Sequence, residues 1–392
     1  MASRHLRDRS GNEQKTTSLE LFFDLVFVFA VTQLSHVLLA ELTLEGVGKL
    51  VLLLLVVWWA WIYTTWMSNV FDPDSEAVRM VLIAVMLAAM LMAVAIPDAF
   101  GDRAMLFACS YVALQVGRNA FTVMALQPGT PQWTSQVRIL AWSVAAGILW
   151  IGGAAVGDPA LPFVWVAALI VDYAGPFARY WTPRLGQAAM SDWDVEGTQF
   201  AERFQLFLII TLGETIVITG ATAADLPLDA ARAVAIGFAF LATAALWWLY
   251  FDFAAALSQA KLAGLSALER GTLARDAFTY IHIPMIAGII ITAVGDELVI
   301  AHPTEHLHAA ELAAVVAGPA LYLLGLVAFR WRMVRSLAGK RLVAIGAILA
   351  VGVFGTSVPA LVAAGLVLAV LVAVAAVETR NRFRFDPLVQ AP

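Results

Sequence analysis

Long apolar segments separated by short polar ones run along nearly the whole chain. Twelve of them reach about 20 residues, the length that a helix needs to cross a hydrocarbon core of about 30 Å. The alternation predicts an all-α, polytopic integral membrane protein. The last two segments are separated only by the short break from Thr356 to Pro359, so eleven spans is the alternative. The predicted spans are roughly 17–41, 46–68, 77–97, 103–126, 135–156, 160–181, 201–222, 232–258, 276–300, 309–331, 341–357 and 359–378.

Composition excludes the soluble classes. Hydrophobic residues make up 61% of the 392 residues and charged residues 14%, against about 25% charged in an average soluble domain. The mean hydropathy is +0.82. The single cysteine, Cys109, excludes an intramolecular disulfide. The basic residues are scattered at segment ends, a distribution that argues against nucleic-acid binding.

Charge at the segment ends predicts the orientation. The apolar run that follows the basic N-terminal residues is too long and too acidic for a cleaved signal peptide, so it is expected to remain as the first span. With twelve spans and an inside N-terminus, nearly all of the 24 Lys and Arg lie at cytoplasmic ends; the exceptions are Lys49, Arg103 and Arg232 outside and Arg118 within a span. This bias follows the positive-inside rule and predicts that both termini are cytoplasmic.

A weak internal repeat is visible. The motif that begins at Leu19 resembles the one that begins at Ala201, and the aromatic cluster at Trp58 resembles the one at Trp247. An even number of spans in each half predicts parallel 6+6 repeats, a plan found among secondary transporters. The predicted parts are a cytoplasmic tail 1–16, a first six-helix half 17–181, a central cytoplasmic loop 182–200, a second six-helix half 201–378 and a cytoplasmic tail 379–392.

Ionisable side chains inside the spans are the first candidates for function, because they are costly in hydrocarbon unless they face a polar interior. Glu20 and Asp24 are four residues apart and therefore share one helix face. Arg118 cannot lose its charge, so it needs an acid partner. For this partner, Asp24 is the first choice, because it lies at the same depth in the membrane as Arg118, and Glu214 is the second. A buried ion pair that merely fixes the helix register is an equally open interpretation.

Further candidates lie along the same predicted pathway. Glu214 is the most deeply placed carboxylate, and a buried acid can carry a proton. His282 is followed by Pro284 and could act as a pH-dependent switch. Glu20 and Glu202 would line the cytoplasmic mouth. The candidate substrate or proton pathway comprises Glu20, Asp24, Gln115, Arg118, Glu202, Arg203, Glu214, His282 and Asp296, with His36, Asp172, Asp252 and Glu297 as secondary candidates.

No motif predicts a catalytic residue, a metal site or a cofactor. The chain contains neither an H-E-x-x-H zinc motif nor a G-x-S-x-G nucleophile elbow. His302, Glu305, His306 and His308 fall in one external loop, but no second group of ligands accompanies them. The aromatic band from Trp58 to Trp66 is expected to anchor the second span at the membrane interface.

Several of these stretches carry a family resemblance. The run from Leu19 to His36, LELFFDLVFVFAVTQLSH, resembles the opening signature of the bacterial low-temperature-requirement A (LtrA) family. The similarity covers residues 18–302, about three quarters of the chain. It implies a bacterial inner-membrane protein associated with growth in the cold, without a known substrate or reaction. The supporting stretches are Trp58 to Trp66 with Asp72, Gln115 to Arg118, Ala201 to Phe204, Leu212 to Ile216, His282 to Met285 and Gly295 to Leu298.

Three classes of function follow. The favoured one is a secondary transporter or permease for a small solute, with proton coupling as one form of it. The net-acidic cytoplasmic half favours a cation, or a cationic or zwitterionic solute. The alternative is a membrane sensor or a lipid-binding adaptation protein, and the third is an intramembrane enzyme of unknown reaction. Membrane lipids and a small molecule or ion are the expected partners.

Overall fold

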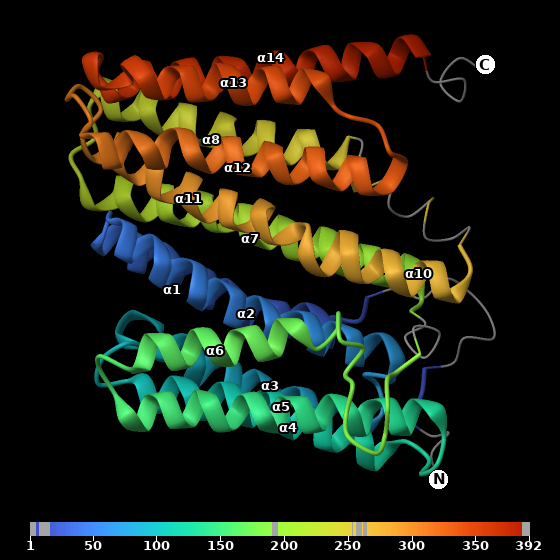
Figure 1. The fold of residues 1–392 in the computed structure, drawn as a ribbon. Helices are drawn as coiled ribbons and strands as arrows, with labels where there is room; N and C mark the ends of the chain where they lie inside the picture. Colours follow the sequence, from blue (N-terminus) through green and yellow to red (C-terminus); the bar gives the residue numbers. More distant parts are fainter. Residues whose placement is uncertain are drawn as a thin grey trace. The chain divides into compact units, whose positions relative to one another are not determined.

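The computed structural model describes residues 5–7, 16–189, 195–252, 254–255, 261 and 265–385. Within these ranges the regular structure is helical, and the only β contacts are three isolated bridges. The helices are α1 Ser18–Ala40, α2 Leu44–Val70, α3 Glu76–Ala95, α4 Ala104–Ala125, α5 Pro131–Val156, α6 Leu161–Ala174, α7 Gly197–Asp225, α8 Ala230–Phe251, α10 Ala267–Leu273, a π-helical segment Ala274–Tyr280, α11 His282–Ala301, α12 Ala309–Val334, α13 Gly339–Phe354 and α14 Ala360–Phe385 (Figure 1).

The predicted fold class is confirmed. Ten helical segments of the described chain are long and apolar enough to cross a membrane. The other two predicted spans correspond to α4 and α6. In α4 the polar residues Gln115, Arg118 and Asn119 lower the hydropathy, and α6 has 14 residues, which is only about 21 Å of helix. The protein is therefore a polytopic all-α membrane protein with helices at all twelve predicted positions.

The last apolar block forms two helices. α13 ends at Phe354, a 3-10 turn covers Gly355–Ser357, and α14 begins at Ala360. Pro359 stands directly before α14, where its missing N–H does not interrupt the helical hydrogen bonds. The two helices then pack against each other. The structure thus favours the twelve-helix reading over the eleven-helix alternative.

The contacts divide the chain into two compact units. The first contains α1 up to Val37, α2 from Val47, α3 to α6, α7 up to Phe207, and the described residues 265–279. The second contains residues 38–46, α7 from Leu208, α8, and α11 to α14. The division into six-helix halves at 17–181 and 201–378, and the tandem repeat, stay predictions.

Tryptophans make up much of the core of the first unit. Trp58, Trp59 and Trp61 of α2 are each at most 2% exposed. The predicted interfacial position is therefore wrong for these three side chains. Their indole rings instead pack inside the unit, and the Trp58 Nε1 donates a hydrogen bond to the Thr279 carbonyl oxygen at 2.6 Å. Because α2 continues to Val70, the cluster lies within the helix rather than at its end.

Glycines bring α11 and α12 of the second unit into close contact. Gly288 and Gly295 lie on α11, and Gly318 and Gly325 lie on α12. Within each pair the spacing is about two helical turns, so both glycines share a face. A Cβ atom added at Gly318 would lie 2.5 Å from the backbone nitrogen of Thr292. Small residues at such positions let the backbones of membrane helices approach each other.

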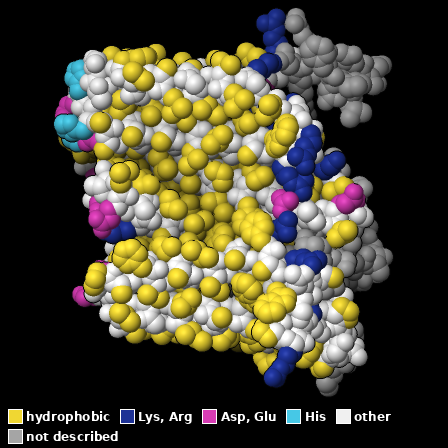
Figure 2. All heavy atoms as spheres, in the orientation of Figure 1, with side chains coloured by type: hydrophobic (Ala, Val, Ile, Leu, Met, Phe, Trp, Pro, Cys, Tyr) yellow, Lys and Arg dark blue, Asp and Glu magenta, His cyan; other side chains and the backbone are white. Residues whose placement is uncertain are grey.

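The surface of the second unit matches a membrane environment. Val343, Val353 and Val362 are exposed, and Figure 2 shows hydrophobic side chains covering the middle of its visible face. His306 and His308 lie at one end of α12, and Lys and Arg gather at the other. An apolar belt between two polar ends is what a lipid bilayer requires.

Candidate functional site

A buried ion pair joins α1 and α7 within the first unit. The Arg203 Nη2 donates to the Asp24 Oδ1 at 2.7 Å, and the two side chains are 1% and 0% exposed. The same carboxylate oxygen accepts a hydrogen bond from the Trp61 Nε1 of α2 at 2.8 Å. Arg203 also lies over the ring of Phe23, 5.8 Å from its centre. The three helices are thus linked through one carboxylate.

This pair retains unused hydrogen-bonding capacity. Among the described residues, nothing donates to the Asp24 Oδ2, and nothing accepts from the Arg203 Nε or Nη1. All three atoms are buried. Unsatisfied buried polar atoms are costly and uncommon in folded proteins. Asp24 and Arg203 therefore present an acceptor and two donors that a bound solute or water could satisfy.

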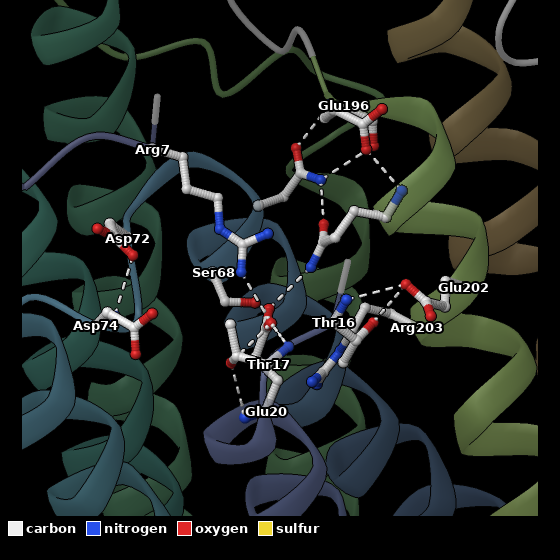
Figure 3. Close-up of polar contacts among 12 residues, drawn as sticks. Arg7, Thr16, Thr17, Glu20, Ser68, Asp72, Asp74, Glu196, Glu202 and Arg203 are labelled. Carbon is white, nitrogen blue, oxygen red and sulfur yellow. Dashed lines mark hydrogen bonds and ion pairs between the residues drawn. The ribbon is translucent and has the colours of Figure 1, made fainter. Parts of the chain in front are cut away.

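A second carboxylate, Glu20, closes a polar network at the start of α1 (Figure 3). Its Oε2 accepts from the Arg7 Nη2 at 2.8 Å and from the Thr17 backbone nitrogen at 2.8 Å. The Thr17 Oγ1 in turn accepts from the Glu20 backbone nitrogen at 3.3 Å. This reciprocal arrangement is a capping box, which satisfies two amide groups at the helix start. Glu20 therefore caps α1 and also binds the N-terminal segment.

The network continues from Glu20 to the start of α7. The Gln199 Nε2 donates to the Glu20 Oε1 at 2.8 Å, and the Gln199 Oε1 accepts from the Asn69 Nδ2. Asn69 exchanges hydrogen bonds with the backbone of Glu196. The Glu202 Oε2 accepts from the backbone nitrogen and hydroxyl of Thr16 at 2.9 and 3.0 Å. These contacts hold the first turns of α1 and α7 and the end of α2 together.

Arg118 is held by neutral oxygens. Its Nη1 donates to the Thr64 Oγ1 at 3.1 Å and to the Ala60 carbonyl oxygen at 3.3 Å. Its Nη2 donates to the Gln115 Oε1, and the Asn119 Oδ1 lies 3.4 Å away. No described carboxylate lies within ion-pair distance of the guanidinium. The predicted pairing of Asp24 with Arg118 is therefore wrong, because Asp24 binds Arg203.

Arg118 nevertheless connects to an acid through a chain of hydrogen bonds. The Gln115 Nε2 donates to the Tyr111 hydroxyl at 3.0 Å, and that hydroxyl donates to the Asp172 Oδ2 at 2.9 Å. The Trp150 Nε1 donates to the same Asp172 oxygen at 3.0 Å. The buried carboxyl group of Asp172 on α6 is thereby linked to the buried guanidinium of Arg118 on α4. The structure brings Gln115, Arg118 and Asp172 into one cluster.

The other predicted residues lie apart from these clusters. His36 is exposed on α1. In the second unit, the His282 Nε2 lies 3.1 Å from the Tyr250 hydroxyl, Asp252 accepts from Thr379 at 3.5 Å, and Glu214 is buried at 1% exposure. Asp296 borders a small cavity of that unit, whereas Glu297 does not. Within the described chain no group of three metal-ligating side chains occurs.

Similarity to known proteins assigns the chain to a family. The family model described as bacterial low temperature requirement A protein (LtrA) matches residues 15–376. The chain belongs to the LtrA family. The chain is also 39% identical over 331 residues to uncharacterized protein RA0937 of Rhizobium meliloti (strain 1021), which covers 83% of this chain and 80% of that protein. No solved structure matches it.

Four of the stretches that resemble the LtrA family lie in the first unit, whereas Leu212 to Ile216, His282 to Met285 and Gly295 to Leu298 lie in the second. The opening signature supplies Glu20 and Asp24, and the stretch Ala201 to Phe204 supplies Arg203. The family match also extends to residue 376, well beyond the resemblance seen in the sequence. Sequence reasoning missed Arg7 and Gln199 as partners of Glu20. The spacing Thr17-x-x-Glu20 signals the capping box, whereas no pattern in the sequence indicates the contacts with Arg7 and Gln199.

Replacing Glu20 by Gln should loosen the start of α1 in this LtrA protein. The Arg7 ion pair is lost, and a hydrogen bond to a charged group contributes about 1.5–3 kcal/mol. Hydrogen exchange of the amides at residues 16–20 should therefore speed up by about tenfold or more. The matched control is Asp74→Asn, which removes an exposed ion pair with Arg79. Equal exchange in both variants would show that Glu20 does not anchor the helix.

Proposed function

We propose that this LtrA protein is a secondary transporter whose central site is the buried Asp24–Arg203 pair. The observation that carries the proposal is the position of this pair. Two ionised side chains lie inside helices long and apolar enough to span a membrane, about 1% exposed or less. Charges in such positions are expensive and mark substrate or ion pathways.

The unused atoms indicate the class of solute. The free Asp24 Oδ2 can accept from an ammonium group, and the free Arg203 Nε and Nη1 can donate to a carboxylate. A small zwitterion presents both groups and adds no net charge to a buried site. Of the cationic and zwitterionic solutes expected from the sequence, the unused atoms of the pair therefore favour a zwitterion. Because the pair is buried, the solute reaches it only when the helices separate, as in alternating access.

The remaining clusters take supporting roles in this proposal. Glu20, Gln199 and Glu202 form the polar end of α1 and α7, next to the predicted cytoplasmic mouth. The chain from Arg118 through Tyr111 to Asp172 fixes the polar side of α4. The protein resides in the bacterial inner membrane with both termini in the cytoplasm, as the basic segment ends favour. Solute uptake would then support growth in the cold.

A second candidate function is lipid binding. A groove of about 700 Å³ lies between α8 and α14. Leu241, Ala245 and Trp248 line one side and Val372 and Ala376 the other, with Arg380 at one end. An acyl chain would fit the apolar walls, and a phosphate group would pair with the arginine. This observation favours the membrane-adaptation alternative, which predicts a co-purifying anionic phospholipid.

Purified protein in sealed liposomes separates the two candidates. The liposomes contain a pH-sensitive dye, and neutral amino acids, polyamines and inorganic cations are added outside one at a time. If the protein is a transporter, a zwitterionic solute should change the internal pH or, when the solute carries a label, bring that label into the liposomes. Neither signal should appear with empty liposomes. A flat response to every solute, together with stoichiometric anionic phospholipid in the purified protein, would overturn the transporter proposal.

A further inference from the structure

A small cavity in the second unit is lined by an ionisable group that the Asp24–Arg203 site does not use. The cavity has a volume of about 20 Å³ and is bordered by α8, α11, α12 and α14. A site of roughly 10–15 Å³ or more can hold one water molecule. Most of its wall is alanine, valine and leucine. Asp296 is the one titratable residue among the described residues that line it.

The carboxylate of Asp296 has an unused oxygen there. Its Oδ2 is buried, and no described residue donates a hydrogen bond to it. Thr292, four residues earlier on α11, lines the same cavity, so the two side chains share a helix face. The Thr292 hydroxyl donates to the Gly288 carbonyl oxygen at 2.7 Å. Its oxygen lone pairs therefore remain able to accept or to coordinate a cation.

A proline in α12 lines the same cavity and leaves one backbone carbonyl without its helical hydrogen bond. Pro319 lies inside the helix and lines the cavity together with Val315. Proline has no N–H, so the Val315 carbonyl, four residues earlier, receives no hydrogen bond from position 319. Gly295 lets the Val315 backbone approach α11, since a Cβ there would lie 2.9 Å from the Val315 Cα. Asp296, Thr292 and Val315, whose carbonyl lacks its helical hydrogen bond from position 319, thus line one cavity.

We propose that this cavity binds one small monovalent cation, with Asp296 as its counter-charge. The inference rests on the proposed transport function, because it names the ion that would be coupled to the solute. Oxygen ligands and freed helix carbonyls are the donors by which transporters coordinate Na⁺ or H⁺. One carboxylate in an apolar wall balances a single positive charge, whereas a divalent ion would leave one charge unbalanced. The occupant is a sodium ion or a proton held on Asp296.

Binding to purified full-length protein in detergent tests this without any solute. Thermal unfolding is followed by tryptophan fluorescence in sodium chloride and in choline chloride of equal ionic strength. A sodium site predicts a saturable rise of the melting temperature in sodium, lost in Asp296→Asn. Thr292→Val removes one oxygen at similar volume and should raise the half-saturating sodium concentration about tenfold. Glu305→Gln, an exposed acid outside the cavity, is the control and should keep the full response.

A proton site gives a different signature. In the absence of sodium, infrared difference spectra across a pH titration should show the carbonyl stretch of a protonated carboxylic acid that Asp296→Asn lacks. If Asp296→Asn does not fold, Thr292→Val tests the sodium site instead, through the expected rise in its half-saturating sodium concentration. The proposal is overturned if the wild type shows neither a sodium-dependent shift nor such a band, or if Asp296→Asn retains whichever of the two signals the wild type shows. Loss of transport with intact binding would contradict the proposed function and leave this site standing.

Discussion

Replacing Asp24 by Asn should lower the free energy of unfolding by about 3–5 kcal/mol, because the Arg203 guanidinium stays buried without its counter-charge. The asparagine side chain keeps an oxygen that can accept the Trp61 hydrogen bond. The lost free energy of unfolding therefore measures the effect of removing the negative charge. The measurement is reversible chemical denaturation of the protein in mixed micelles, with wild type and variant under the same conditions.

The double variant Asp24→Asn with Arg203→Gln provides the matched control. It removes both charges and leaves two neutral amides that can hydrogen-bond each other. Replacing a whole buried pair by neutral groups is far less costly than breaking it, so most of the lost stability should return. A double variant no more stable than Asp24→Asn alone would show that the two residues are not coupled.

Replacing Gly318 by Ala should destabilise the second unit by about 1–3 kcal/mol, the usual cost of adding volume to a packed contact. The new methyl group would lie 2.5 Å from the Thr292 backbone nitrogen, and a backbone atom cannot turn away as a side-chain tip can. α11 and α12 must then move apart. The same denaturation experiment measures the change.

Gly346→Ala is the control for the intrinsic effect of the substitution. Gly346 lies inside α13, and a Cβ atom there meets nothing within 4 Å. Alanine in a helix interior is favoured over glycine by about 1 kcal/mol, so this variant should be as stable as the wild type or more so. If both alanine variants gain stability, the close helix contact does not constrain position 318.

The membrane fold could be predicted from the sequence because it depends on the length and polarity of local segments. The sequence leaves one span or two open for the last apolar block, because the break from Thr356 to Pro359 is short, and the structure resolves it into α13 and α14. α4 was identified despite Arg118, since the apolar residues on either side are numerous enough to define a helix. These features require no knowledge of which helices are neighbours.

The partners within the site could not be predicted in the same way. Asp24 and Arg203 were both candidates, but depth along a helix does not say that α1 lies beside α7, and 179 positions separate the two residues. Arg118 was expected to need an acid, yet amide and hydroxyl oxygens of its own and a neighbouring helix satisfy the guanidinium. Trp61 is predicted to be an interfacial anchor yet is buried in the first unit, because the sequence does not show which face of α2 packs against other helices.

The most direct test of the transport account is solute uptake by the double variant Asp24→Asn with Arg203→Gln in sealed liposomes. If Asp24 and Arg203 bind the solute, this variant should regain most of its stability but move no zwitterionic solute above the level of empty liposomes. Glu20→Gln, which loosens the helix start, should retain measurable uptake. Uptake by the double variant at the wild-type rate would contradict the account and would reduce the Asp24–Arg203 pair to a structural link between helices.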